Sequence, residues 1–101
     1  MRVIYRNDRL EEYLNNPKRL AKDFPPAVVK AVPKKLKALK EAESLRHLLL
    51  LTGGSKKLKG RRQHQHRLEL DGQFRLILEV VNTKPLTVMI MAIGDIHKKG
   101  H

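Results

Sequence analysis

Three strand-like segments follow one another in the last third of the sequence, and this succession constrains the fold more than any other feature. Apolar residues alternate along residues 66–70 and fill most of residues 74–81 and 86–93. Asp71-Gly72 and the segment 82–85, which ends in proline, are typical turn sequences. Because connections this short join neighbouring strands antiparallel, we expect a three-stranded antiparallel sheet.

Helical signals dominate the chain before these strands. Residues 2–5 predict a short opening strand, and Asp8 with Glu11 three positions later predicts the start of a helix. Asn16-Pro17 favours a restart, with asparagine as the N-cap and proline in the first turn. The prolines that follow Phe24 should end this helical region by Asp23.

A second helix is expected over residues 27–43, where apolar residues recur every three or four positions. Pro33 lies inside this pattern and predicts a kink or a fresh start. Residues 45–51 add a helical turn. We therefore expect one α+β domain over residues 1–101, with the order β-α-α-β-β-β and the two N-terminal helices packed on one face of a small sheet.

The first hairpin has two faces of different character. A three-residue loop with Gly72 in the left-handed conformation would set Leu68 opposite Phe74 and Arg67 opposite Arg75. Because residues that face each other across an antiparallel pair share a side, the leucine then lies on one face and the arginines on the other. We expect this loop, and with it a polar face that bears Arg67 and Arg75.

The net charge of the chain indicates which class of partner it binds. The chain has 22 Lys and Arg against 10 Asp and Glu, a formal net charge of +12, and no cysteine. The electrostatic field of so positive a chain attracts polyanions, so nucleic acid is the first partner to consider. The sequence has neither a secretory signal nor an apolar stretch near the roughly 20 residues of a membrane span, so we expect a cytoplasmic protein without a membrane partner. Phosphate-binding glycine loops and hydrolase motifs are also missing.

The densest basic segment precedes the second strand. Five cations in seven residues are candidates for contact with RNA phosphates, although a solvated loop is the alternative: Lys56, Lys57, Lys59, Arg61 and Arg62. His64 and His66 follow, and beside a basic loop they favour RNA contact or local hydrogen bonds over a metal site, because no third ligand has a suitable spacing. We expect no metal and no cofactor.

Arg75 lies in an otherwise aliphatic strand, where a charged side chain needs an explanation. It could pair with Glu69 or Glu79 on the same face. Its planar fork also suits a phosphate, or the charge that develops on a phosphate during transfer. Asp95 and His97 end the last strand, where a carboxylate could orient a general acid or base; a polar chain end is the alternative.

Three local motifs resemble the HigB toxins of the RelE/ParE superfamily, whose order of elements is also similar. They are Lys-Leu-Lys-Gly-Arg-Arg at 57–62, Leu-Asp-Gly-Gln-Phe-Arg-Leu-Ile at 70–77 and Ile-Gly-Asp-Ile-His at 93–97. They are similar to the family's Leu-Lys-Gly loop, its Tyr/Phe-Arg-Leu/Ile strand and its terminal Asp-Tyr-His, with Ile96 in place of the tyrosine.

The resemblance implies a toxin that cuts messenger RNA in the ribosomal A site without a metal ion. A 2′-hydroxyl attacks the adjacent phosphate and leaves a cyclic phosphate and a free 5′-hydroxyl. By this resemblance Lys56, Lys59 and Arg75 stabilise the developing charge, His97 is the acid or base and Asp95 orients it. Arg67 would assist.

The resemblance also implies partners. A HigA-type helix-turn-helix antitoxin would silence the toxin, and the complex would contact operator DNA only through that antitoxin. Two other functions stay open: a ParE-like toxin that poisons gyrase, and a non-catalytic RNA-binding or ribosome-binding protein that uses the same basic face.

Overall fold

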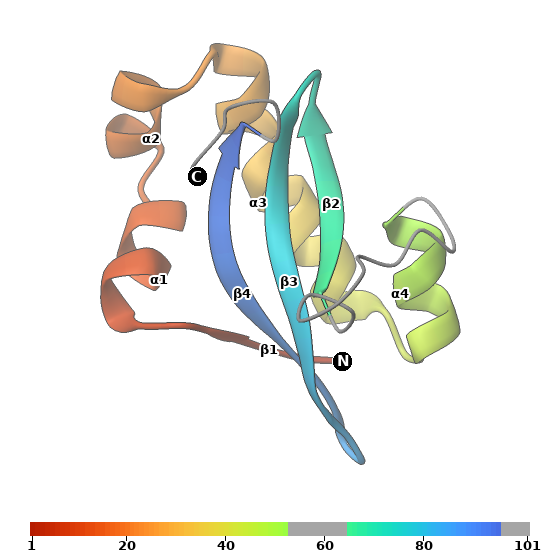
Figure 1. Ribbon diagram of the computed structural model, residues 1–101. Helices are drawn as coiled ribbons and strands as arrows, with labels where there is room; N and C mark the ends of the chain where they lie inside the picture. The colour runs from red at the N-terminus through yellow and green to blue at the C-terminus, as the bar shows by residue number, and fades with distance from the viewer. Residues whose placement is uncertain (53–64, 96–101) are drawn as a thin grey trace.

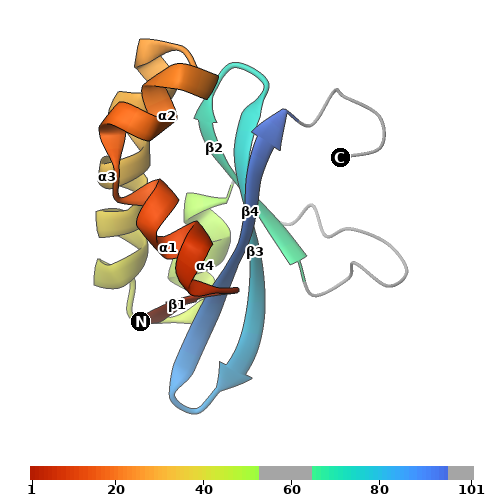
Figure 2. The same ribbon diagram turned by 90° about the vertical axis from the view of Figure 1, so that its left-hand side faces the viewer.

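The computed structural model describes residues 1–52 and 65–95. In chain order its elements are β1 (Arg2–Tyr5), α1 (Asp8–Leu14), α2 (Pro17–Asp23), α3 (Pro26–Glu41), α4 (Leu45–Leu51), β2 (Gln65–Asp71), β3 (Phe74–Thr83) and β4 (Leu86–Asp95). The strands form one sheet, and the helices lie together on one side of it (Figures 1 and 2). The α+β class and the helices packed on one face are confirmed, with four helical segments where the sequence predicted two helices and a turn.

The strand order is β1-β4-β3-β2. β2, β3 and β4 form the expected antiparallel meander, whereas β1 pairs in parallel with β4, from Arg2 opposite Thr87 to Tyr5 opposite Ile90. Parallel neighbours need a long crossover, and the helical layer supplies it. The Met1 ammonium donates hydrogen bonds to the carbonyls of Lys40 (3.0 Å) and Ala42, so the start of β1 also satisfies the C-terminal end of α3.

The predicted restart in the first helical region is confirmed, because α1 ends at Leu14 and α2 begins at Pro17 with Asn16 as its N-cap. Helix α1 begins at Asp8, but its N-cap is the residue before, not Asp8 as the capping-box pattern with Glu11 indicated. Asn7 is the N-cap of α1, and its side chain accepts a hydrogen bond of 2.8 Å from the backbone N–H of Leu10. An asparagine oxygen satisfies this free donor as well as an aspartate would.

The fresh start expected at Pro33 does not occur, because α3 runs through Pro33 as one helix. Pro33 is exposed, while its neighbours Val32 and Leu36 are buried against the sheet. Packing of the inner face therefore compensates for the one backbone hydrogen bond that proline cannot donate. The buried stripe begins at Val28, and Val29 lies at its edge.

The hairpin between β2 and β3 keeps the predicted faces but not the predicted register. Gly72 has a φ of 55°, as expected for the left-handed residue of the turn. The observed register differs from the predicted one by two residues, so Arg67 faces Ile77 and Arg75 faces Glu69, and a bulge lies between Glu69 and Asp71, which pairs with Phe74. A shift of two residues leaves every side chain on its predicted side of the sheet, so the alternation of polar and apolar residues does not distinguish the two registers.

The core lies between the sheet and the helices. The sheet contributes alternate residues with 0% exposure, namely Leu68, Leu76, Leu78, Val88 and Ile90. The helices meet them with Leu14, Leu20, Val28, Val32, Leu36, Leu39 and Leu48. Because the inward residues are almost all aliphatic, the opposite side of the sheet is left to carry the polar side chains of the strands.

An aromatic chain closes one end of this core. The rings of Tyr13 and Phe24 are 6.5 Å apart, and Phe24 meets Phe74 edge to face at 5.6 Å. The Tyr13 hydroxyl donates a hydrogen bond to Asp23. Burial, followed by the hydrogen bond to the Asp23 carboxylate, raises the pKa of Tyr13 to about 12.

A pH-dependent contribution of Tyr13 to stability follows from this raised pKa. The fold favours the neutral phenol, so its contribution is complete below about pH 10, the unfolded pKa of tyrosine, and is lost as the pH rises through about 12. We expect the difference in unfolding free energy between wild type and Tyr13→Phe to be constant up to pH 10 and to shrink above it. Urea titrations at successive pH values measure this difference; a flat profile up to pH 12 would contradict the assignment.

Candidate functional site

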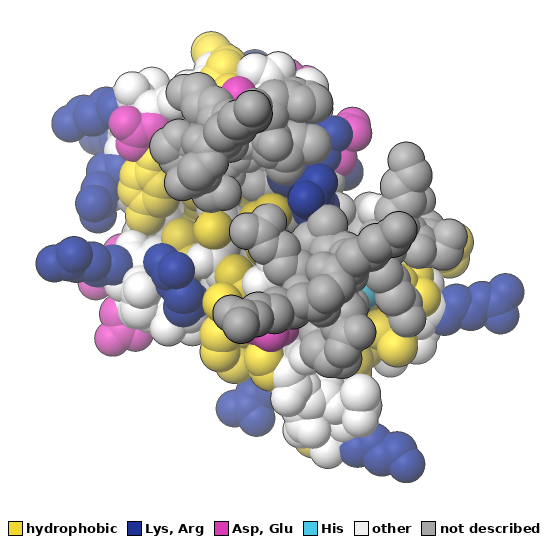
Figure 3. Space-filling view, in the orientation of Figure 1, with side chains coloured by type: hydrophobic (Ala, Val, Ile, Leu, Met, Phe, Trp, Pro, Cys, Tyr) yellow, Lys and Arg dark blue, Asp and Glu magenta, His cyan; other side chains and the backbone are white. Residues whose placement is uncertain are grey.

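The side of the sheet away from the helices, which we call the open face, is defined by Arg67, Glu69, Arg75, Ile77 and Gly94. These residues alternate along β2, β3 and β4 with the buried leucines and Ile93, and they face one another across the strands. Figure 3 looks onto this face and shows dark blue Lys and Arg side chains around its edge, with apolar side chains between them. Arg67 and Arg75 therefore lie on the same face of the sheet, as predicted.

Arg75 is held by its own hairpin. Its Nη1 donates hydrogen bonds to the carbonyls of Gly72 and Phe74, the latter at 3.0 Å, and its Nη2 lies 3.3 Å from Oε2 of Glu69. The side chain is only 18% exposed. These contacts fix the guanidinium on the sheet rather than leave it extended into water, as a preorganised charge requires.

The neighbouring strand β4 leaves room at the position opposite Arg75. Gly94 of β4 is the residue opposite Arg75, and a Cβ added at Gly94 would meet no heavy atom within 4 Å. Arg67 is exposed on the adjacent strand, where its partner across β3 is Ile77. The open face thus presents one fixed cation and one exposed cation, with free space at Gly94 on the strand opposite Arg75.

Asp95 and His66 lie on the other side of the sheet. Asp95 pairs with Phe74, one position from the Arg75–Gly94 pair, and its carboxylate accepts a hydrogen bond of 3.1 Å from Gln73. His66 pairs with Leu78 and is 6% exposed, within the helix-covered layer. The structure brings neither side chain to the open face with Arg75.

The remaining predicted site residues lie outside the described residues. They are Lys56, Lys57, Lys59, Arg61, Arg62, His64 and His97. Their roles stay predictions.

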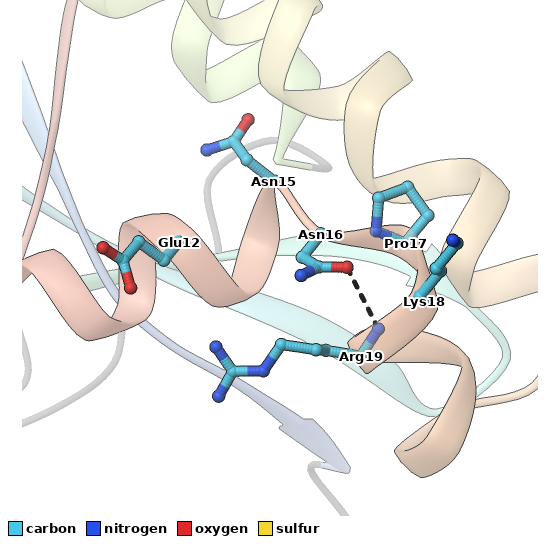
Figure 4. A pocket seen from close by; sticks show the side chains of 6 residues that line it. All are labelled: Glu12, Asn15, Asn16, Pro17, Lys18 and Arg19. Carbon is cyan, nitrogen blue, oxygen red and sulfur yellow. Dashed lines mark hydrogen bonds between the residues drawn. The ribbon is translucent and has the colours of Figure 1, made fainter.

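A polar hollow occurs elsewhere, at the junction of α1 and α2 (Figure 4). Its lining comes from one short stretch of chain: Glu12, Asn15, Asn16, Pro17, Lys18 and Arg19. Figure 4 shows the Asn16 side chain accepting a hydrogen bond of 3.3 Å from the backbone N–H of Arg19, which is the N-cap contact of α2. The hollow follows from the break between two helices and lies on the helical side of the molecule.

Residues 1–52 and 65–95 contain no candidate metal centre and no candidate membrane-spanning helix. No cluster of three His, Cys, Asp or Glu side chains in that part could hold a metal ion. None of its helices is both long and apolar enough to cross a membrane.

Comparison with known proteins gives a match at the level of the fold. No family model and no curated protein matches the sequence. Among solved structures, the YoeB/ParE toxin from Agrobacterium tumefaciens matches with a TM-score of 0.62, over 94% of this chain and 98% of that one, at 10% sequence identity. The chain therefore has the fold of a YoeB/ParE toxin.

Proposed function

We propose that this chain is the toxin of a toxin–antitoxin system, of the HigB type, and that it cuts messenger RNA in the ribosomal A site without a metal ion. The observation that carries the proposal is Arg75: a guanidinium fixed on the open face of a toxin-like fold, opposite a glycine that leaves space for a ligand. The net charge of +12 supports an RNA substrate.

The proposed reaction needs three kinds of group. As the 2′-oxygen bonds to phosphorus and the bond from phosphorus to the 5′-oxygen breaks, Arg75, Lys56 and Lys59 stabilise the charge on the phosphate oxygens. A base takes the proton of the attacking 2′-hydroxyl and an acid gives one to the departing 5′-oxygen; His97 makes one of these transfers and water the other. Asp95 lies on the other side of the sheet from Arg75, and no role in the reaction is proposed for it.

Flanking phosphates would be held by the other cations of the proposal: Lys57, Arg61, Arg62, His64 and Arg67. Of these, Arg67 lies on the open face with its side chain exposed. His66 is buried on the helix-covered side, and the proposal does not extend to it.

A toxin of this kind requires a neutralising partner. The HigB resemblance supports a HigA-type helix-turn-helix antitoxin, with operator DNA contacted only through that antitoxin and with action in the cytoplasm. A reading frame for such a protein next to the gene would support the assignment independently of activity.

Primer extension on cellular messenger RNA after induced expression tests the proposal. We expect new 5′ ends within codons of translated messages, and we expect His97→Ala to abolish them. Intact messages with gyrase trapped on cleaved DNA would instead indicate a ParE-like toxin. Intact messages and intact DNA, with the protein bound to ribosomes, would indicate a non-catalytic RNA-binding protein.

A further inference from the structure

We infer that Glu69 competes with the RNA phosphate for Arg75 and thereby sets the affinity of the open face for RNA. This inference rests on the proposed function, which assigns a phosphate to Arg75. Glu69 would be a positioning residue, because it acts on the substrate only through the guanidinium that it holds.

The donors of Arg75 explain why the two anions compete. Both hydrogens of Nη1 are directed to carbonyls of the hairpin, those of Gly72 and Phe74. An arginine binds an anion with two parallel hydrogen bonds either through Nε and Nη2 or through Nη1 and Nη2, and both arrangements include Nη2. Nη2 lies 3.3 Å from the Glu69 carboxylate. Although Nη2 carries two hydrogens, a phosphate bound to it would lie beside a second anion, so the phosphate and the carboxylate repel each other.

The ion pair between Glu69 and Arg75 can also separate without a change in the sheet. Glu69 faces Arg75 directly across β2 and β3, so the contact forms without any other change in the sheet. The two partners differ in exposure: Arg75 is 18% exposed and fixed by the backbone, whereas Glu69 is 68% exposed. A phosphate can therefore displace the carboxylate into water while the guanidinium stays in place.

The expected effect is modest and specific to this position. Exposed ion pairs contribute at most about 1 kcal/mol, which corresponds to about fivefold in a dissociation constant. Glu79 is a matched control, because it lies on the same side of β3 as Arg75 but about 13 Å along the strand. That distance exceeds the screening length of about 8 Å at physiological salt.

Fluorescence anisotropy with a short RNA, 2′-O-methylated so that it cannot be cleaved, tests the inference. We expect Glu69→Gln to bind this RNA about fivefold more tightly than wild type, and Glu79→Gln to change binding by less than twofold. Arg75→Gln should weaken binding. In the Arg75→Gln background, the effect of Glu69→Gln should fall to that of Glu79→Gln, since the carboxylate then has no guanidinium to occupy.

The outcomes separate this inference from the function on which it rests. If Arg75→Gln weakens RNA binding but Glu69→Gln and Glu79→Gln behave alike, the competition is refuted and the RNA site stands. If Glu69→Gln tightens binding equally with and without Arg75, the effect is one of general charge and the inference is again refuted. If Arg75→Gln leaves binding unchanged, the proposed phosphate site itself is wrong.

Discussion

Arg75→Ala is expected to slow messenger RNA cleavage on the ribosome by about 10²- to 10³-fold, the usual cost of removing one donor that stabilises transition-state charge. The loss should be this large because the guanidinium is fixed on the open face by the Gly72 and Phe74 carbonyls before any substrate binds. Single-turnover cleavage on ribosomes programmed with a defined message measures the rate, and induced cells should no longer stop growing.

Two matched variants show whether the geometry of Arg75 or only its charge is needed. Arg75→Lys keeps the charge but not the planar fork, so we expect it to recover only part of the lost rate. Arg67→Ala removes an exposed cation from the same face and should cost about tenfold or less. Urea unfolding of each variant checks that the fold is intact. Wild-type cleavage by folded Arg75→Ala protein would refute the proposed site.

Leu76→Ala is expected to lower the free energy of unfolding by about 2–5 kcal/mol. Leu76 lies on β3, an inner strand of the sheet, has 0% exposure, and faces Leu68 on one neighbour and Ile93 on the other. The new cavity would be enclosed on both sides by strands that cannot close onto it. Because small domains are stable by only about 5–15 kcal/mol, this one change should leave the protein marginally folded at body temperature.

The adjacent residue is the control for this substitution. Ile77 lies on the open face and is half-buried, so Ile77→Ala removes contacts without leaving an enclosed cavity, and we expect a loss of about 1 kcal/mol. Urea titrations of both variants at neutral pH give the comparison. Equal losses for the two variants would mean that the helix-covered side does not hold the core.

Most secondary structure was predictable from local chemistry. The strands that follow one another in residues 65–95 were located by their alternation and by the turn residues between them, and the alternation also placed Arg67 and Arg75 on one face. The break at Asn16-Pro17 was located because proline fits the first turn of a helix and asparagine caps it. These signals depend only on neighbouring residues, which is why they could be found without tertiary information.

The features that the sequence did not predict depend on contacts between distant segments. The neighbour of β1 could not be assigned, because the pairing of Arg2 with Thr87 joins opposite ends of the sequence. The observed register of the hairpin differs from the predicted one by two residues, which leaves the same side chains on each face, so the pairing of Arg75 with Glu69 remained one of two options. For Asp95, the sequence indicated a place beside the other site residues, and only the register showed that it lies across the sheet from Arg75.

The position of β1 has a consequence for the order in which the protein can be assembled during translation. Of the four strands of the sheet, β1 leaves the ribosome first and its sheet neighbour β4 leaves it last. Contacts between such distant segments form late, because a large loop of chain must close before they can contribute. A nascent chain that still lacks β4 also lacks Gly94, the residue opposite Arg75, so the open face is completed only after synthesis of the last strand.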